Sequence, residues 1–220
     1  HLTHHYAYLH KTFRFPLEIH WNLINPYSLL PFPFEQLFRN TRSIDINGWK
    51  IPTINRKYYL VYLAVHGSKH RWYFLSWLKD FAELIIQTST TDQHEAIDQC
   101  IALHLEKPVV QSYILAHLFF DTKIPARIME LYNQEKGIDT FISKTIAEIN
   151  TPLERIKRNK HQNIKYQLKL RKNLQYKLDT IFRLKTHHKD WEIINLPDKL
   201  FFIYYLLRPF LYFIRLFRKN

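Results

Sequence analysis

The residues that could do chemistry are concentrated in one stretch, residues 66–80. We predict a single helix over residues 57–86, and on a helix, side chains three or four positions apart lie on the same side. One side of this helix combines cationic, aromatic and acidic side chains: Lys69, His70, Tyr73, Trp77 and Asp80. Lysine and aspartate are rarely buried without a partner, so this stripe is not typical of a core. It predicts the lining of a binding site, with a structural network of ion pairs as the alternative.

Two histidines in this stretch, His66 and His70, have the spacing of two ligands of one metal ion on a helix. In the zinc motif with this spacing, a glutamate follows the first histidine, whereas here Gly67 does. The histidine pair therefore gives little support to a zinc site.

A further candidate, Glu18, lies on a predicted strand near the start of the chain. We predict two strands, residues 6–10 and 15–21, joined by a turn. In the second strand, apolar residues alternate with Glu18 and His20, which is typical of a half-buried strand. The alternating apolar residues are Leu17, Ile19 and Trp21. We expect them to point into the core and Glu18 to lie on the opposite face, which is either a solvated surface or a position for a metal-binding carboxylate.

Other elements must position these candidates. Asn47-Gly48 predicts a β-hairpin with strands over residues 43–46 and 49–52, because both turn positions require a positive φ. From residue 55 onward the pattern predicts helix almost throughout. After the central helix we expect short helices over residues 92–105, 109–120, 125–136 and 140–150. Short helices joined by short loops pack as an antiparallel bundle.

Beyond residue 150 the chain becomes basic. Residues 151–189 are predicted as one long helix with twelve Lys or Arg residues against two acidic ones. Its charged side is either a solvated face or a surface that binds anions. Residues 196–220 are aromatic and basic and fall short of the ~20 apolar residues that span a bilayer. We expect this segment either to lie on an anionic membrane surface or to close the bundle as a buried helix.

The composition excludes two classes of enzyme and indicates the kind of partner. With only three glycines in 220 residues, the chain lacks the glycine-rich loops of P-loop and dinucleotide-binding enzymes. The net charge of +13 predicts an anionic partner, namely nucleotide phosphates, nucleic acid or a lipid surface. The single cysteine, Cys100, lies in an apolar helical pattern and is interpreted as a small hydrophobic residue in a reduced compartment. The chain begins with His1, so we expect upstream sequence.

Three segments together resemble a known family. They are residues 17–21 (Leu-Glu-Ile-His-Trp), residues 45–48 (Asp-Ile-Asn-Gly) and residues 63–80, of which the part from His66 to Asp80 is the most specific. They resemble the uncharacterised bacterial nucleotidyltransferases of the polymerase-β superfamily. The resemblance covers about residues 1–149, with a weaker part over residues 196–218.

The resemblance implies a reaction and roles for the candidate residues. Enzymes of this superfamily use an Asp-x-Asp pair and a third carboxylate to hold two Mg²⁺ ions during nucleotidyl transfer from a nucleoside triphosphate. Glu18 matches the third carboxylate, while the Asp-x-Asp pair has no counterpart here and is expected upstream of His1 or lost. The helical part resembles a lid over the nucleotide, which implies that Lys69 contacts phosphate and Trp77 packs or stacks beside it. Asp80 would hold Lys69 or His70 in place, and Tyr73 would share their face.

We therefore predict a mainly α, α+β chain. Residues 1–55 would form a partial nucleotidyltransferase-like sheet, residues 56–150 a helical bundle, and residues 151–220 a basic helix followed by an aromatic, basic terminal helix. The predicted function is transfer of a nucleoside monophosphate to an unidentified acceptor, in the cytoplasm or at the inner membrane face. The alternative is a non-catalytic basic helical module that binds nucleic acid or an anionic membrane surface.

Overall fold

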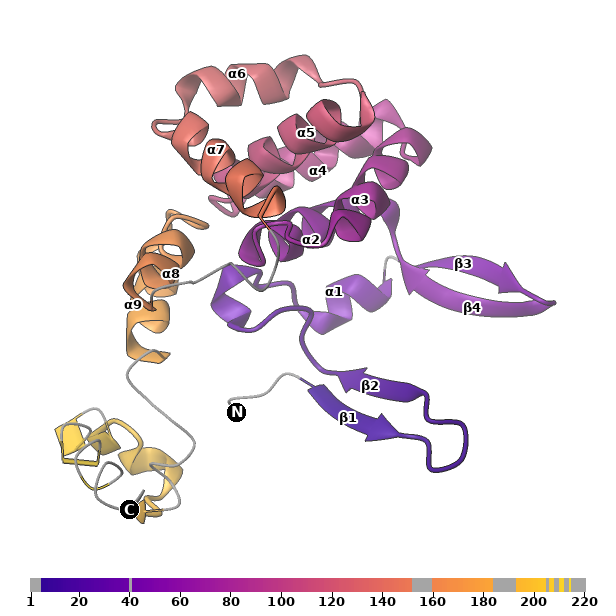
Figure 1. Cartoon of the computed structure of the whole chain (residues 1–220). Helices are drawn as coiled ribbons and strands as arrows, with labels where there is room; N and C mark the ends of the chain where they lie inside the picture. Colours follow the sequence, from indigo (N-terminus) through magenta and orange to yellow (C-terminus); the bar gives the residue numbers. More distant parts are fainter. Residues whose placement is uncertain are drawn as a thin grey trace.

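The computed structural model describes residues 5–39, 41–151, 160–183, 193–204, 206–207, 210–211 and 214, which form nine α-helices and two β-hairpins (Figure 1). The predicted class, α+β and mainly α, is confirmed. Each hairpin extends away from the helices, which stack on one another in the rest of the molecule (Figure 1).

The two hairpins are separate antiparallel sheets. Strand β1 (His5–Leu9) pairs with β2 (Pro16–His20), and β3 (Thr41–Ile46) pairs with β4 (Trp49–Ile54). Asn47 and Gly48 have positive φ values of 52° and 84°, as the hairpin prediction required. No hydrogen bonds join the two pairs among the described strands, so these four strands form two separate hairpins in place of one partial sheet.

The predicted burial of β2 is wrong. All five residues of β2 are exposed, including Leu17 at 53% and Ile19 at 54%, while Trp21 beyond it is half-buried against Tyr6. Alternation identified the strand, because Glu18 and His20 do share a face. The alternation could not predict whether either face is buried, because burial requires a second layer of structure packed against the strand.

The helical part begins with α1 (Phe34–Arg39) and continues with α2 (Arg56–Lys69), α3 (Leu75–Gln87), α4 (Thr90–Ala102), α5 (Glu106–Phe120), α6 (Ala126–Gln134) and α7 (Ile138–Ile149). Helix α5 lies at the centre and contacts α2, α3, α4, α6 and α7. Its apolar residues Val110, Leu115 and Ala116 are fully buried, as are Leu78 and Phe81 of α3. The core therefore lies mainly between the helices, and Ile54 at the end of β4 packs against its edge.

Two predicted helices are interrupted. The helix predicted over residues 57–86 is wrong, because α2 ends at Lys69 and α3 begins at Leu75. The long basic helix is likewise wrong over its described part, where α8 (Lys160–Gln167) and α9 (Leu174–Arg183) are separated by a short linker. In that linker the buried Arg171 side chain donates to the carbonyl oxygens of Leu103 and Ser28, which ties the linker to the helical body. Residues 152–159 and 184–189 of this predicted helix lie outside the described residues.

The C-terminal segment contains a short 3-10 helix (Asp198–Leu200), and Tyr204 and Leu211 are buried. None of the helices in the described part of the chain is both long enough and apolar enough to cross a membrane. Because much of residues 196–220 lies outside the described residues, membrane contact by this segment stays a prediction.

Candidate functional site

The site is built around a sharp turn between α2 and α3. Arg71 and Trp72 have φ values of 58° and 51°, in the left-handed region that side chains other than glycine rarely adopt. The backbone N–H of Trp72 donates to the carbonyl oxygen of Gly67 at 2.8 Å, which closes the turn. The fully buried indole of Trp72 lies directly against Gly67, in space that any side chain at residue 67 would fill. The turn therefore depends on a small residue in the last part of α2.

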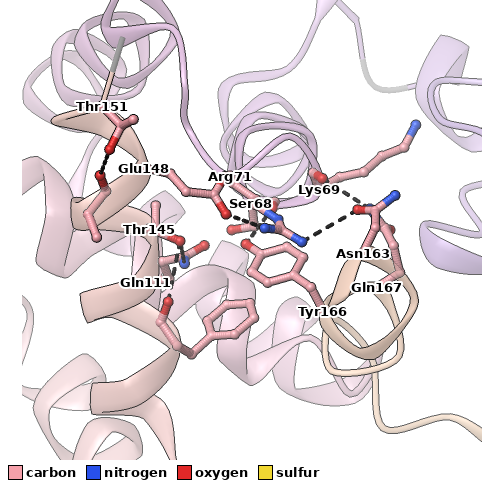
Figure 2. A network of polar contacts seen from close by, with 12 residues as sticks. Ser68, Lys69, Arg71, Gln111, Thr145, Glu148, Thr151, Asn163, Tyr166 and Gln167 are labelled. Carbon is pink, nitrogen blue, oxygen red and sulfur yellow. Dashed lines mark hydrogen bonds and ion pairs between the residues drawn. The ribbon is translucent and has the colours of Figure 1, made fainter. Parts of the chain in front are cut away.

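A network of polar contacts with α7 and α8 also holds the turn (Figure 2). Arg71 is buried and forms an ion pair with Glu148 of α7, and its guanidinium lies 4.2 Å from the centre of the Tyr166 ring on α8. Figure 2 shows the Lys69 side chain pointing away from this network. Arg71 therefore belongs to the structural network. The two candidate residues that precede it, Lys69 and His70, are half-buried.

The turn brings several of the predicted site residues together. His70 lies 5.5 Å from Trp77 between ring centres, and Tyr73 lies 5.3 Å from Trp77. His66 completes the group at 4.8 Å from His70 and 5.0 Å from Trp77. We call these four residues, His66, His70, Tyr73 and Trp77, the aromatic cluster. It joins the end of α2 to the start of α3, and each of its members is partly exposed.

Tyr62 and Tyr59 extend the aromatic cluster along α2. Tyr62 lies 5.4 Å from His66, and Tyr59 lies 6.1 Å from Tyr62. Burial raises the pKa of the Tyr62 hydroxyl, and its electrostatic interactions with Tyr59 and Glu18 raise the pKa further. Burial likewise raises the pKa of Tyr59, with Asp80 adding to this effect. Both predicted carboxylates, Glu18 on β2 and Asp80 on α3, therefore act electrostatically on this row of rings.

Glu18 itself is exposed and contacts the neighbouring His20, whose Nε2 lies 2.9 Å from Glu18 Oε2. No group of three or more His, Cys, Asp or Glu side chains in the described part of the chain is arranged to hold a metal ion. Glu18 can supply one oxygen ligand of the kind that Mg²⁺ prefers. His66 and His70 lie close to each other and to Trp77 through their rings.

The comparison with known families decides the class of protein. The model of a family described as uncharacterised nucleotidyltransferase matches residues 1–121, which is more than half of the chain. The chain belongs to this nucleotidyltransferase family. The matched residues include Glu18 and the whole turn between α2 and α3, whereas α6 to α9 lie beyond them. Searches of curated proteins and of solved structures give no match.

In this nucleotidyltransferase family member, sequence reasoning missed the residues that shape the turn. Gly67 carried a usable signal, because a glycine inside a helical pattern often marks close packing or the end of a helix. Arg71 and Trp72 gave no such signal, since both fit a continuous helix. The partners of Arg71, which are Glu148 and Tyr166, lie 77 and about 95 residues further along the chain, too far for any local pattern to indicate.

Cys100 is not available for nucleophilic chemistry in this family member. Its side chain is buried in α4, and burial raises the pKa of its thiol well above the ordinary value. Because the thiolate is the reactive form, we expect no alkylation of Cys100 by iodoacetamide at pH 8 in the native protein and complete alkylation in denaturant. Mass spectrometry of the intact protein measures both. Rapid modification of the native protein would contradict the buried position.

Proposed function

We propose that the protein transfers a nucleoside monophosphate from a nucleoside triphosphate to an acceptor in a Mg²⁺-dependent reaction. The observation that carries this function is the family match, which covers Glu18 and the α2–α3 turn together. The net charge of +13 supports an anionic substrate.

In this function Glu18 is a metal-binding carboxylate. Its exposed position on a short strand would let a Mg²⁺ ion approach without displacing core residues. When bound, two Mg²⁺ ions would stabilise the negative charge that develops at the transferred phosphoryl group. The reaction also requires an Asp-x-Asp pair, which these 220 residues do not contain. The proposed function therefore concerns the complete protein, and an upstream Gly-Ser turn with an Asp-x-Asp pair in the reading frame would support it.

The turn would supply the nucleotide contacts. We assign Lys69 to the triphosphate, because it stands at the edge of the aromatic cluster and its side chain points away from the structural network (Figure 2). Trp77 and Tyr73 would pack beside the nucleotide, and His70 would donate a hydrogen bond to it. Asp80 would balance the positive charge at the edge of this surface.

Replacing Lys69 tests the assignment. We expect Lys69→Ala to weaken binding of the triphosphate by the complete protein by about 1.5–3 kcal/mol, the value of a hydrogen bond to a charged group. Lys79→Ala is the matched control, because Lys79 is an exposed lysine on α3 outside the assigned contacts. Calorimetric titration with Mg²⁺ and each of the four common ribonucleoside triphosphates measures the affinities. Unchanged affinity in Lys69→Ala, together with a lower melting temperature, would assign Lys69 to structure instead.

The alternative is a basic module that binds nucleic acid or an anionic membrane surface without catalysis. The high positive charge favours it, because such binding depends on charge and weakens as salt screens it. The two functions differ in one measurable property. Metal-dependent release of pyrophosphate from a nucleoside triphosphate by the complete protein occurs only in the first.

A further inference from the structure

Helix α8 contacts the backbone of the site turn directly. The Tyr166 hydroxyl donates to the carbonyl oxygen of Ser68 at 2.7 Å, and the Gln167 side-chain amide donates to the carbonyl oxygen of Lys69 at 3.2 Å. Both donors and both carbonyl groups are visible in Figure 2. Ser68 and Lys69 are the last two residues of α2, so these bonds join α8 to the part of α2 that bears the candidate phosphate contact.

The last carbonyl groups of a helix have no partner within the helix. At the end of many helices, water or a glycine-based cap satisfies them. Here the Ser68 carbonyl oxygen accepts from the backbone N–H of Arg71 at 3.0 Å and also from the Tyr166 hydroxyl, while the Lys69 carbonyl oxygen accepts from Gln167. Both side-chain donors come from 98 residues further along the chain, and Tyr166 makes a further contact that holds its ring. The Tyr166 ring stacks on Phe141 of α7 at 4.7 Å with an angle of 9° between the rings. The donors to this turn are therefore held rigidly by α7 and α8.

A second layer holds α8. The Tyr176 hydroxyl on α9 donates to the carbonyl oxygen of Gln167 at 2.7 Å, and Tyr176 is fully buried. A continuous series of contacts thus runs from α9 through α8 to Ser68 and Lys69. None of the residues that donate in this series lies within residues 1–121, which match the nucleotidyltransferase family.

We propose that Tyr166 and Gln167 are positioning residues for the nucleotide contacts at Lys69 and His70, so that the C-terminal region sets the nucleotide affinity of the site. This inference rests on the proposed function. A contact residue that is already held in its bound position loses less conformational entropy when the ligand binds. Without these two bonds the end of α2 would sample more positions, and the affinity for nucleotide would fall.

Tyr166→Phe tests this role because it removes only the hydroxyl and keeps both the stack on Phe141 and the ring beside Arg71. Tyr113→Phe is the matched control. Tyr113 is also a buried tyrosine, and its hydroxyl donates to Gln93, away from the turn. We expect Tyr166→Phe to bind nucleoside triphosphate about three- to tenfold more weakly than the parent, the effect of one hydrogen bond. Tyr113→Phe should bind as the parent does.

Two measurements are made on the complete protein. Calorimetric titration with Mg²⁺ and the four common ribonucleoside triphosphates gives the affinities. Hydrogen exchange measures how fast the backbone amides of His70, Arg71 and Trp72 exchange with solvent. We expect faster exchange of these amides in Tyr166→Phe than in Tyr113→Phe, after correction for global stability. This second readout does not depend on any ligand.

The outcomes separate the two proposals. Weaker affinity with faster local exchange, found in Tyr166→Phe and not in Tyr113→Phe, supports the positioning role. If the parent binds nucleotide and Tyr166→Phe binds equally well, the positioning role is overturned while the proposed function stands. If the parent binds no nucleoside triphosphate, the proposed function fails, and the positioning role fails with it.

Discussion

Glu18→Gln is expected to lower nucleotidyl transfer by the complete protein by about 10²- to 10³-fold, the range found when one electrostatic contact of the transition state is removed. Glutamine keeps the shape of the side chain and loses its charge, so a Mg²⁺ ion would lose one of its anionic ligands. The rate at saturating nucleotide and at a fixed Mg²⁺ concentration that just saturates the parent, followed by pyrophosphate release, measures the effect. Raising the Mg²⁺ concentration should restore part of the lost rate, because the weakened site would fill again.

The same substitution should hardly change folding. Glu18 is about half exposed as a side chain, at 51%, and its contact with His20 is a surface pair. Glu130→Gln is the matched control, since Glu130 is exposed to a similar degree, at 55%, and forms a comparable local pair with Arg127. Both variants should melt close to the parent. Transfer by Glu18→Gln at the parental rate would remove Glu18 from the metal site and leave the aromatic cluster as the remaining basis of the site.

Local chemistry made the turn of the second hairpin and most of the short helices predictable. The Asn47-Gly48 turn follows from the φ values that its two residues tolerate, and no distant contact is needed to explain it. Helices α5 and α7 were likewise predicted from local sequence, with ends within three residues of those observed. These elements are determined within a few residues of sequence, which is why sequence reasoning identifies them.

The candidate site was predictable only in part. The stripe from Lys69 to Asp80 was derived for one continuous helix, yet His70, Tyr73 and Trp77 do lie together, because they meet around a turn. The turn itself depends on the packing of Trp72 against Gly67 and on the bond from Tyr166, and these contacts are set by tertiary structure. The exposed face of β2 has the same explanation, because the layer that would bury it is not specified by the strand.

Gly67 provides the strongest test of that turn, because two principles predict opposite signs for Gly67→Ala. Helix propensity alone predicts a gain of about 0.5–1 kcal/mol, since alanine favours a helix over glycine. Packing predicts a loss. A Cβ atom at residue 67 would lie 2.3–2.4 Å from three carbon atoms of the Trp72 ring, far inside van der Waals contact. The ring cannot move into solvent, because Trp72 is fully buried and packs against Phe81 at 5.8 Å.

We therefore expect Gly67→Ala to lower the free energy of unfolding by about 3 kcal/mol or slightly more, at the upper end of the cost of overpacking a core. For a chain of this size that corresponds to a melting temperature lower by roughly 6–12 °C, measurable by calorimetry or circular dichroism. Gly48→Ala and Gly137→Ala are the controls. Both glycines have a positive φ with no atom within 4 Å of an added Cβ, so each should cost only about 1–2 kcal/mol of backbone strain.

A double variant distinguishes the contact with Trp72 from a general intolerance at residue 67. Trp72→Leu alone should destabilise the protein, because it leaves a cavity where the indole was. In the Trp72→Leu background, however, Gly67→Ala should cost much less than it does in the parent, since the added methyl group would occupy part of that cavity. Equal costs in the two backgrounds, or a Gly67→Ala protein as stable as the parent, would show that the indole does not lie against Gly67. The turn that carries Lys69 and His70 would then have to be closed by other contacts.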